Sequence, residues 1–283
     1  MSPLLDKLLF PWRILWRTIL RFDKDHGAFL ASGLAFNMVL CVLPFLLILA
    51  SLSGYFLESS QKAQNDILTF FQRALPGATA RIQTSISRFL ENRELIGAVG
   101  LVSLVFFASR LFGSIRVVLN LTFNQEHDLN IITGKLFDIG MVVLTTMLLV
   151  LSIFLSSVVG LLQKLGESWL FTRGYDIFVI KGWLGDGIAF VLSTAMFFVM
   201  YRMPLPSRVP TWIVALQAFI VGALWEFAKW LFGLYLTNLG RFDVFYGSFG
   251  VLVALVLWID YSAIIFVIGA ELGATIFDLR KKR

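Results

Sequence analysis

The sequence predicts an all-α integral membrane protein, a polytopic helical bundle with six transmembrane helices. Of its 283 residues, 58% are hydrophobic and 15% are charged, and the mean hydropathy is +0.82. A soluble domain has about 45–50% apolar residues and about 25% charged ones. The apolar residues also gather in blocks of about 20 or more, the length that a helix needs to cross hydrocarbon. Beside the spans, the pattern predicts an interfacial helix at the N-terminus and an extracytoplasmic helical hairpin.

Residues 1–24 predict an amphipathic helix that lies in the interface between hydrocarbon and water. Arg13, Arg17 and Arg21 recur every four residues, and leucines and tryptophans occupy another face. Basic amphipathic helices of this kind bind anionic headgroups and anchor a chain at the membrane surface. We therefore expect membrane lipids to be partners of this helix, and residues 25–283 to form the six-span membrane domain.

The first span is predicted over residues 27–57, which is longer than the bilayer requires. It contains Asn37 and Pro44, and a proline inside a helix releases a backbone carbonyl and favours a kink. The following residues, 61–93, are amphipathic and are interrupted by a Pro-Gly pair. That pattern is typical of two surface helices joined by a turn, so we expect the helical hairpin here.

Five more apolar blocks predict the remaining spans. They cover residues 95–119, 136–162, 182–203, 211–236 and 249–277. Six spans place both termini on one side of the membrane. Lysines and arginines are more frequent near the span ends on that side, and such residues face the cytoplasm. We therefore expect both termini in the cytoplasm.

The last predicted span contains two acidic residues, Asp260 and Glu271. They are eleven residues apart, which on an α-helix brings them within about 20° of one face and about 16 Å apart along the axis. A carboxylate at such depth costs about 3 kcal/mol or more unless it faces water or a partner. Small residues at Gly269, Ala270 and Gly273 predict close approach of a neighbouring helix.

Arginines of the second span supply partners at matching depth. Counting about 1.5 Å per residue from the start of each helix places Arg110 near the depth of Asp260, and Arg116 near that of Glu271. We predict two interhelical ion pairs, Asp260–Arg110 and Glu271–Arg116.

Two interpretations of the polar residues in the spans stay open. They either neutralise one another and hold the bundle together, or they line a path for a substrate, an ion or a proton. Glu226 and Lys229 in the fifth span are three residues apart and are expected to pair within their helix. The candidate residues are Asn37, Arg110, Arg116, Asn120, Glu226, Lys229, Asp260 and Glu271.

The two histidines, His26 and His127, each lie beside acidic residues in segments expected to face the cytoplasm. No fixed ligand spacing joins them, so they are weak candidates for a metal site, and we expect neither a metal nor another cofactor. The sequence has no nucleophile motif, Walker loop or zincin signature, so we expect no enzyme. Its basic residues are dispersed or interfacial, which does not favour nucleic acid as a partner.

Three stretches of the sequence form a recognisable pattern. They are "GAFLASGLAFNMVLCVLPFLLIL", "FFASRLFGSIRVVLNLTFN" with Asn120, and "EFAKWLFGLYL" followed by "FYGSFGVLVALVLWIDYSAIIFVIGAELGA". These resemble the first span, the second span and the C-terminal signature of the YihY/BrkB family of bacterial inner-membrane proteins, over about residues 20–277. The residues of the C-terminal match are Lys229, Tyr235, Tyr246, Gly247, Trp258, Ser262, Gly269, Ala270 and Glu271. Asp260 departs from the pattern, which usually has an aromatic residue there.

The resemblance implies a multi-pass protein of the bacterial inner membrane. Relatives have carried the label ribonuclease BN, but this sequence has no cluster of metal-binding His and Asp residues. The family has also been linked to lipid-precursor export and serum resistance. We predict a transporter or flippase of an amphipathic, lipid-like envelope substrate. The alternative is an envelope scaffold or assembly protein that transports nothing, and the poorer alternative is a membrane-bound hydrolase or ribonuclease.

Overall fold

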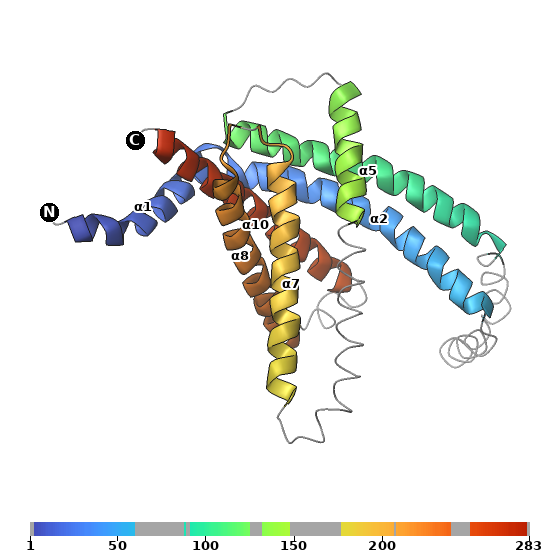
Figure 1. The fold of residues 1–283 in the computed structure, drawn as a ribbon. Coiled ribbons are helices and arrows are strands. Elements are labelled where there is room, and N and C mark those ends of the chain that lie inside the picture. The colour runs from blue at the N-terminus through green and yellow to red at the C-terminus, as the bar shows by residue number, and fades with distance from the viewer. Residues whose placement is uncertain are drawn as a thin grey trace. The chain divides into compact units, whose positions relative to one another are not determined.

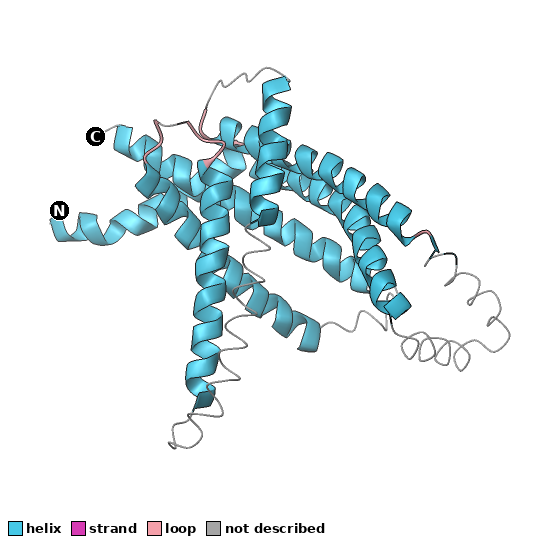
Figure 2. Ribbon diagram, turned by 45° about the vertical axis from the view of Figure 1, so that its right-hand side comes forward, coloured by secondary structure: helices cyan, strands magenta, loops and turns pink. Residues whose placement is uncertain are grey.

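The structure is a computed structural model that describes residues 3–59, 88, 91–124, 132–147, 177–206, 208–238 and 250–281. Within these ranges the regular elements are all helices, as predicted (Figures 1 and 2). They are α1 (Pro3–Lys24), α2 (Gly27–Ser59), α5 (Arg93–Thr122), a helix over residues 132–147, α7 (Ile177–Arg202), α8 (Thr211–Asn238) and α10 (Gly250–Lys281).

Four of the described helices are long and apolar enough to cross a membrane. They are Gly27–Tyr55, Arg93–Thr122, Thr211–Tyr235 and Leu252–Lys281, and each coincides with a predicted span. A shorter apolar stretch, Phe190–Arg202, falls in the predicted fourth span. The count of six spans stays a prediction, because much of the third predicted span and nearly all of the predicted hairpin over residues 61–93 lie outside the described residues.

The boundary between α1 and α2 is a tight turn at His26. The backbone N–H of Asp25 still donates to the carbonyl of Arg21, at 2.8 Å. His26 then adopts a φ of 54°, in the left-handed region that ends helices. This turn separates the amphipathic helix from the first apolar helix, at the position where the sequence changes from charged to apolar.

The chain forms two compact units, of which the second covers Asn37–Arg110. In this unit the later part of α2 packs against the first part of α5 through small residues. The hydroxyl of Ser51 donates to the carbonyl of Arg93 at 2.8 Å, and a Cβ at Gly100 would lie 3.1 Å from the Cβ of Leu47. Small residues therefore allow two apolar helices to approach closely, as they do in membranes generally.

The first unit covers Met1–Phe36 and Leu111–Arg283. In it α7 packs on α8, α8 on α10 and α10 on α1 (Figure 1). The ring of Tyr201 on α7 stacks on that of Phe266 on α10, with centroids 4.6 Å apart, and the Tyr201 hydroxyl donates to the carbonyl of Phe266 at 2.8 Å. The buried phenol thus has a hydrogen-bond partner, which it needs in an apolar core.

The small residues of α10 face its neighbours, as predicted. Ala270 is fully buried, and the Cα atoms of Gly269 and Gly273 lie where a side chain would collide with Val221 or Gln217 of α8. α10 therefore approaches α7 and α8 at a distance that larger residues would prevent.

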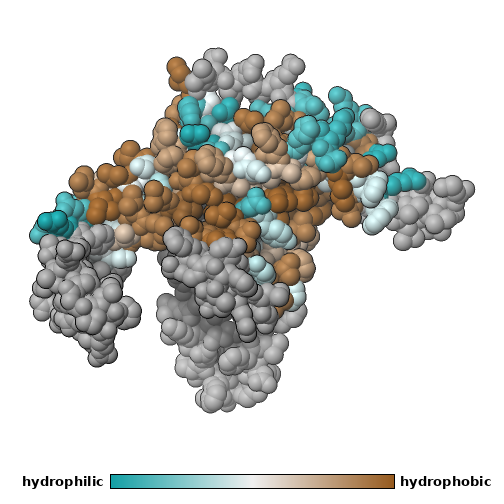
Figure 3. Space-filling view, turned by 180° about the vertical axis from the view of Figure 1, so that it is seen from behind, coloured by the Kyte–Doolittle hydropathy of each residue, from teal (hydrophilic) through white to brown (hydrophobic). Residues whose placement is uncertain are grey.

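Apolar side chains cover much of the outer surface. Figure 3 shows brown, hydrophobic residues over much of the described surface and teal, hydrophilic ones gathered at its edges. On α1 the exposed apolar residues lie on one face and include Trp12, Trp16 and Ile19. Lipid-facing helices and interfacial helices have such surfaces.

Substituting Gly269 by alanine should destabilise the first unit. The new methyl group would lie 2.5 Å from the Tyr201 hydroxyl and would also collide with Val221, and overpacking of this kind costs about 1–3 kcal/mol. Gly233 on α8 is the control, because a Cβ there has no neighbour within 4 Å. Thermal unfolding of both variants in detergent measures the difference. Equal melting temperatures would contradict the assigned contact.

Candidate functional site

Arg21 of α1 is the centre of a cluster of charged groups in the first unit. Its Nε lies 3.0 Å from Oε2 of Glu271 and 3.4 Å from Oδ2 of Asp25. Its Nη1 lies 2.5 Å from Oδ2 of Asp278, and its Nη2 donates to the backbone carbonyl of Thr122. We call Arg21, Asp25, Glu271 and Asp278 the Arg21 cluster.

The burial of Glu271 makes this cluster energetically important. Its side chain is 0% exposed, and that of Arg21 is 16% exposed. A buried carboxylate loses its hydration, a penalty of several kcal/mol that only a close and well-oriented partner offsets. The guanidinium of Arg21 therefore holds α1 against α10 and against the end of α5, three segments that are far apart in the sequence.

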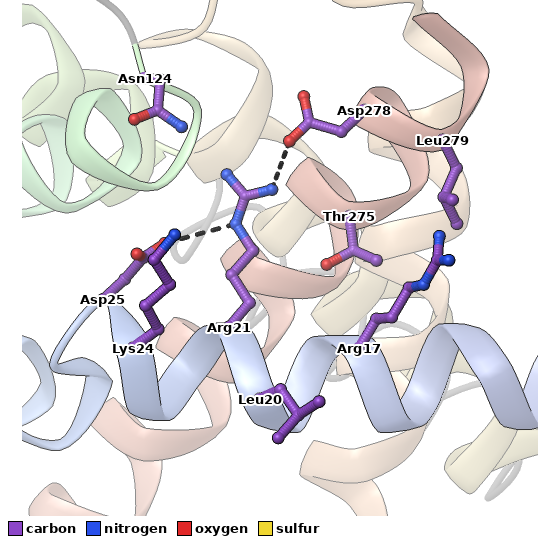
Figure 4. Close-up of a pocket in the computed structure, with 9 residues that line it drawn as sticks. All are labelled: Arg17, Leu20, Arg21, Lys24, Asp25, Asn124, Thr275, Asp278 and Leu279. Carbon is purple, nitrogen blue, oxygen red and sulfur yellow. Dashed lines mark hydrogen bonds and ion pairs between the residues drawn. The ribbon is translucent and has the colours of Figure 1, made fainter. Parts of the chain in front are cut away.

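A pocket of about 550 Å³ opens beside the cluster, and we call it the α1 pocket. Figure 4 shows Arg17 and Arg21 projecting from the same side of α1, toward α10. The lining residues are Arg17, Leu20, Arg21, Lys24, Asp25, Asn124, Thr275, Asp278 and Leu279. Three cations, Arg17, Arg21 and Lys24, line the pocket against two carboxylates, Asp25 and Asp278.

A second pocket of about 570 Å³ adjoins the first, with which it shares Asn124 and Asp278. We call it the basic pocket, because three cations and one carboxylate line it. Its residues are Phe123, Asn124, Arg208, Pro210, Phe277, Asp278, Arg280 and Lys281.

Arg116 of α5 forms a two-pronged ion pair with Asp138, which lies in the helix over residues 132–147. Nε of Arg116 lies 3.2 Å from Oδ1, and Nη2 lies 3.1 Å from Oδ2. Paired contacts of this kind are the strongest arrangement that an arginine and a carboxylate form. The Asp138 side chain is 2% exposed. Gly134 leaves the space for the guanidinium, since a Cβ there would lie 2.9 Å from Nη2.

The predicted pair of Glu226 and Lys229 is confirmed. Nζ of Lys229 lies 2.7 Å from Oε1 of Glu226, and the two side chains are 40% and 27% exposed. The hydroxyl of Ser193 on α7 also donates to Oε1 of Glu226, at 3.1 Å. The pair therefore joins α7 to α8 at a partly exposed position.

The predicted pair of Glu271 and Arg116 is wrong, because each residue has another partner. Glu271 is bound by Arg21, and Arg116 is bound by Asp138. The prediction compared the depths of charged residues in the membrane spans only. It expected the arginines of the N-terminal helix to bind lipid headgroups. The four-residue spacing of those arginines indicated a polar face, but it did not show that one of them turns toward the bundle.

The predicted pair of Asp260 and Arg110 stays a prediction, because the two residues belong to different units. Asp260 is half-buried on α10, and Asn120 is half-buried on α5, both in the first unit. Asn37 is the first residue of the second unit. Within the first unit, neither Asp260 nor Asn120 takes part in the ion pairs of the Arg21 cluster.

The histidines receive no further support as metal ligands. His26 is exposed at the turn between α1 and α2, and His127 lies outside the described residues. Among the residues that the structure describes, no group of three or more His, Cys, Asp or Glu side chains is placed to hold a metal ion.

Replacing Arg21 by alanine should destabilise the protein by about 3 kcal/mol or more, because it leaves Glu271 buried without its cation. Arg17 is the matched control, since it lies one turn away on the same helix and lines the same pocket while being exposed. Thermal unfolding in detergent measures both variants, and the control should change little. An Arg21 variant as stable as the Arg17 variant would contradict the role of the ion pair.

A double-mutant cycle should rank the two remaining pairs by their burial. We expect a coupling energy of about 1–3 kcal/mol between Arg116 and Asp138, which is bidentate and mostly buried. The pair of Glu226 and Lys229 is the control and should couple by about 0.5 kcal/mol, since it is a single contact between residues three apart on one helix. Glutamine or asparagine replacements preserve the shapes of the side chains. Equal coupling in both cycles would contradict the ranking.

The comparison with known proteins identifies the family. The family described as "Virulence factor BrkB" matches residues 18–283. A protein of Pseudoalteromonas atlantica named "UPF0761 membrane protein" is 27% identical over 252 residues, which cover 88% of this chain and 81% of the relative. A protein of the same name from Cronobacter sakazakii is 27% identical over 280 residues, which cover 97% of this chain and 91% of the relative.

A third such relative, from Alkalilimnicola ehrlichii, is 25% identical over 251 residues, which cover 89% of this chain and 55% of the relative. No solved structure matches. The family match covers nearly the whole chain, and it includes Glu271, Arg116 and the C-terminal part of α1 with Arg21. With its apolar helices, the chain is an integral membrane protein that belongs to the BrkB virulence factor family.

Proposed function

We propose that this protein transports or flips an anionic, amphipathic envelope molecule of lipid-like character across the bacterial inner membrane. The observation that supports this proposal best is the composition of the α1 pocket. Charged side chains form most of its lining, and Leu20 and Leu279 add apolar surface. Such a site offers ion pairs to an anionic headgroup and apolar contact to the chain attached to it.

The apolar face of α1 continues from the pocket. Leu20 lines the pocket and is itself exposed, as are its neighbour Ile19 and, one turn earlier, Trp16. An interfacial helix with this face lies at the depth where headgroups meet acyl chains. A lipid-like molecule could therefore reach the charged lining from the membrane without first entering water.

The distribution of charge supports a cytoplasmic location for this end of the first unit. The two pockets together are lined by six basic residues and by two acidic ones, Asp25 and Asp278. The six are Arg17, Arg21, Lys24, Arg208, Arg280 and Lys281. Basic residues near span ends concentrate on the cytoplasmic side, so we propose that both termini face the cytoplasm.

An envelope scaffold or assembly protein is the second candidate, and a specific observation favours it. Glu271, Arg116 and Glu226, three of the residues predicted for a path, each form an ion pair within the protein. Internal pairing of this kind holds helices together without any substrate. A hydrolase or ribonuclease is the poorest candidate, because the sequence has no nuclease-type cluster of His and Asp residues.

Reconstitution into liposomes tests transport. Wild-type protein should move a fluorescent anionic phospholipid between the leaflets. The double variant Arg17→Gln with Lys24→Gln should move it at least about tenfold more slowly, because each lost charge removes about 1 kcal/mol of attraction to an anionic surface. The matched control is Arg88→Gln with Lys135→Gln, two exposed residues that line neither pocket. Absence of lipid movement across several anionic headgroups would instead favour the scaffold.

A further inference from the structure

We propose that the basic pocket binds the phosphate of an anionic phospholipid headgroup. The site is distinct from the N-terminal helix, since its cations come from the loop before α8 and from the end of α10. Binding there does not require that the protein transports lipids.

The charge of the basic pocket is unbalanced. Arg208, Arg280 and Lys281 line it, and in the described part of the chain none of the three forms an ion pair. The carboxylate in the lining, that of Asp278, is already bound by Arg21 at 2.5 Å. An anionic ligand would therefore supply the compensating charge that the described residues around the pocket do not supply.

The geometry of the cations suits a phosphate. The guanidinium of Arg280 lies over the ring of Trp212, 5.8 Å from its centroid, which fixes the direction of a long side chain. The N–H donors of a guanidinium can meet phosphate oxygens in pairs. Arg208 and Lys281 are exposed and can reach the same ligand.

The end of α5 and the start of α8 shape the pocket. Asn124 ends α5 with a φ of 48°, and its backbone N–H donates to the carbonyl of Leu121 at 3.1 Å. The carbonyl of Pro210 accepts from Ile213 at 3.0 Å and starts α8. The first turn of α8 thus brings the partial positive charge of a helix N-terminus to the pocket, while the C-terminal ends of α5 and α10 bring partial negative charge. The attraction for an anion therefore comes from the side chains of Arg208, Arg280 and Lys281.

The position of the pocket favours a lipid over a free anion. α8 begins at Thr211 and α10 ends at Lys281, and both contain candidate membrane spans. Trp212 is 52% exposed beside the pocket, and tryptophans concentrate at the level of the headgroups. Phe123 and Phe277 add an apolar wall, with ring centroids 6.2 Å apart. A volume of about 570 Å³ is sufficient for a headgroup.

Native mass spectrometry of the full-length chain in detergent tests the site by counting bound lipids during a titration with phosphatidylglycerol. The variant Arg208→Gln with Lys281→Gln should bind phosphatidylglycerol about thirtyfold more weakly than the wild type. The reason is that it loses two positive charges, and each contributes about 1 kcal/mol near a membrane surface. The charge-preserving variant Arg208→Lys with Lys281→Arg should retain binding. The charge-matched control Arg88→Gln with Lys135→Gln should do so too, because both residues lie outside the pocket.

Two further ligands identify the source of the phosphate. Phosphatidylcholine carries a phosphate without net negative charge and should bind more weakly than phosphatidylglycerol, while inorganic phosphate should not displace the anionic lipid. Equal affinity of wild type and the glutamine variant would overturn the proposal, as would equal losses in the glutamine and charge-preserving variants. Displacement by inorganic phosphate would show a site for a soluble anion and would overturn the assignment to lipid.

Discussion

The ion pair between Arg21 and Glu271 is the constraint on which the first unit depends. Glu271 is completely buried, so its charge is tolerable only where a cation reaches it. That cation comes from α1, a helix whose exposed apolar face would otherwise let it lie anywhere along the membrane surface. The pair therefore gives this amphipathic helix a fixed position against α10. The α1 pocket exists because α1 is held there.

The same arrangement separates the charges of this protein into two classes. The two buried carboxylates Glu271 and Asp138 are paired, with Arg21 and Arg116. Among the described residues of the basic pocket, the cations, which include Arg208 and Lys281, exceed the carboxylates. The proposed binding of an anionic ligand is consequently concentrated at this end of the first unit. A transporter would need a further path for the ligand, whereas a scaffold would need only its attachment to lipid.

The extent of the helices was predictable because hydropathy and helix periodicity are local properties. The predicted spans at residues 27–57 and 249–277 differ by only a few residues from α2 and α10. The pair of Glu226 and Lys229 was predictable for the same reason, since a helix places residues three apart on one face. The buried face of small residues on α10 followed from the close approach that glycine and alanine permit.

The sequence by itself determined an all-helical membrane protein, its amphipathic first helix and the positions that needed charge compensation. Only the tertiary structure decided which residues provide that compensation. Arg21 and Asp278 are 257 residues apart, and Asp138 reaches Arg116 from a neighbouring helix. Matching depths along isolated helices cannot select among such partners, because the choice depends on which helices pack together and on the direction of each side chain. The desolvation of Glu271 made a partner necessary, and the packing of α1 on α10 selected Arg21.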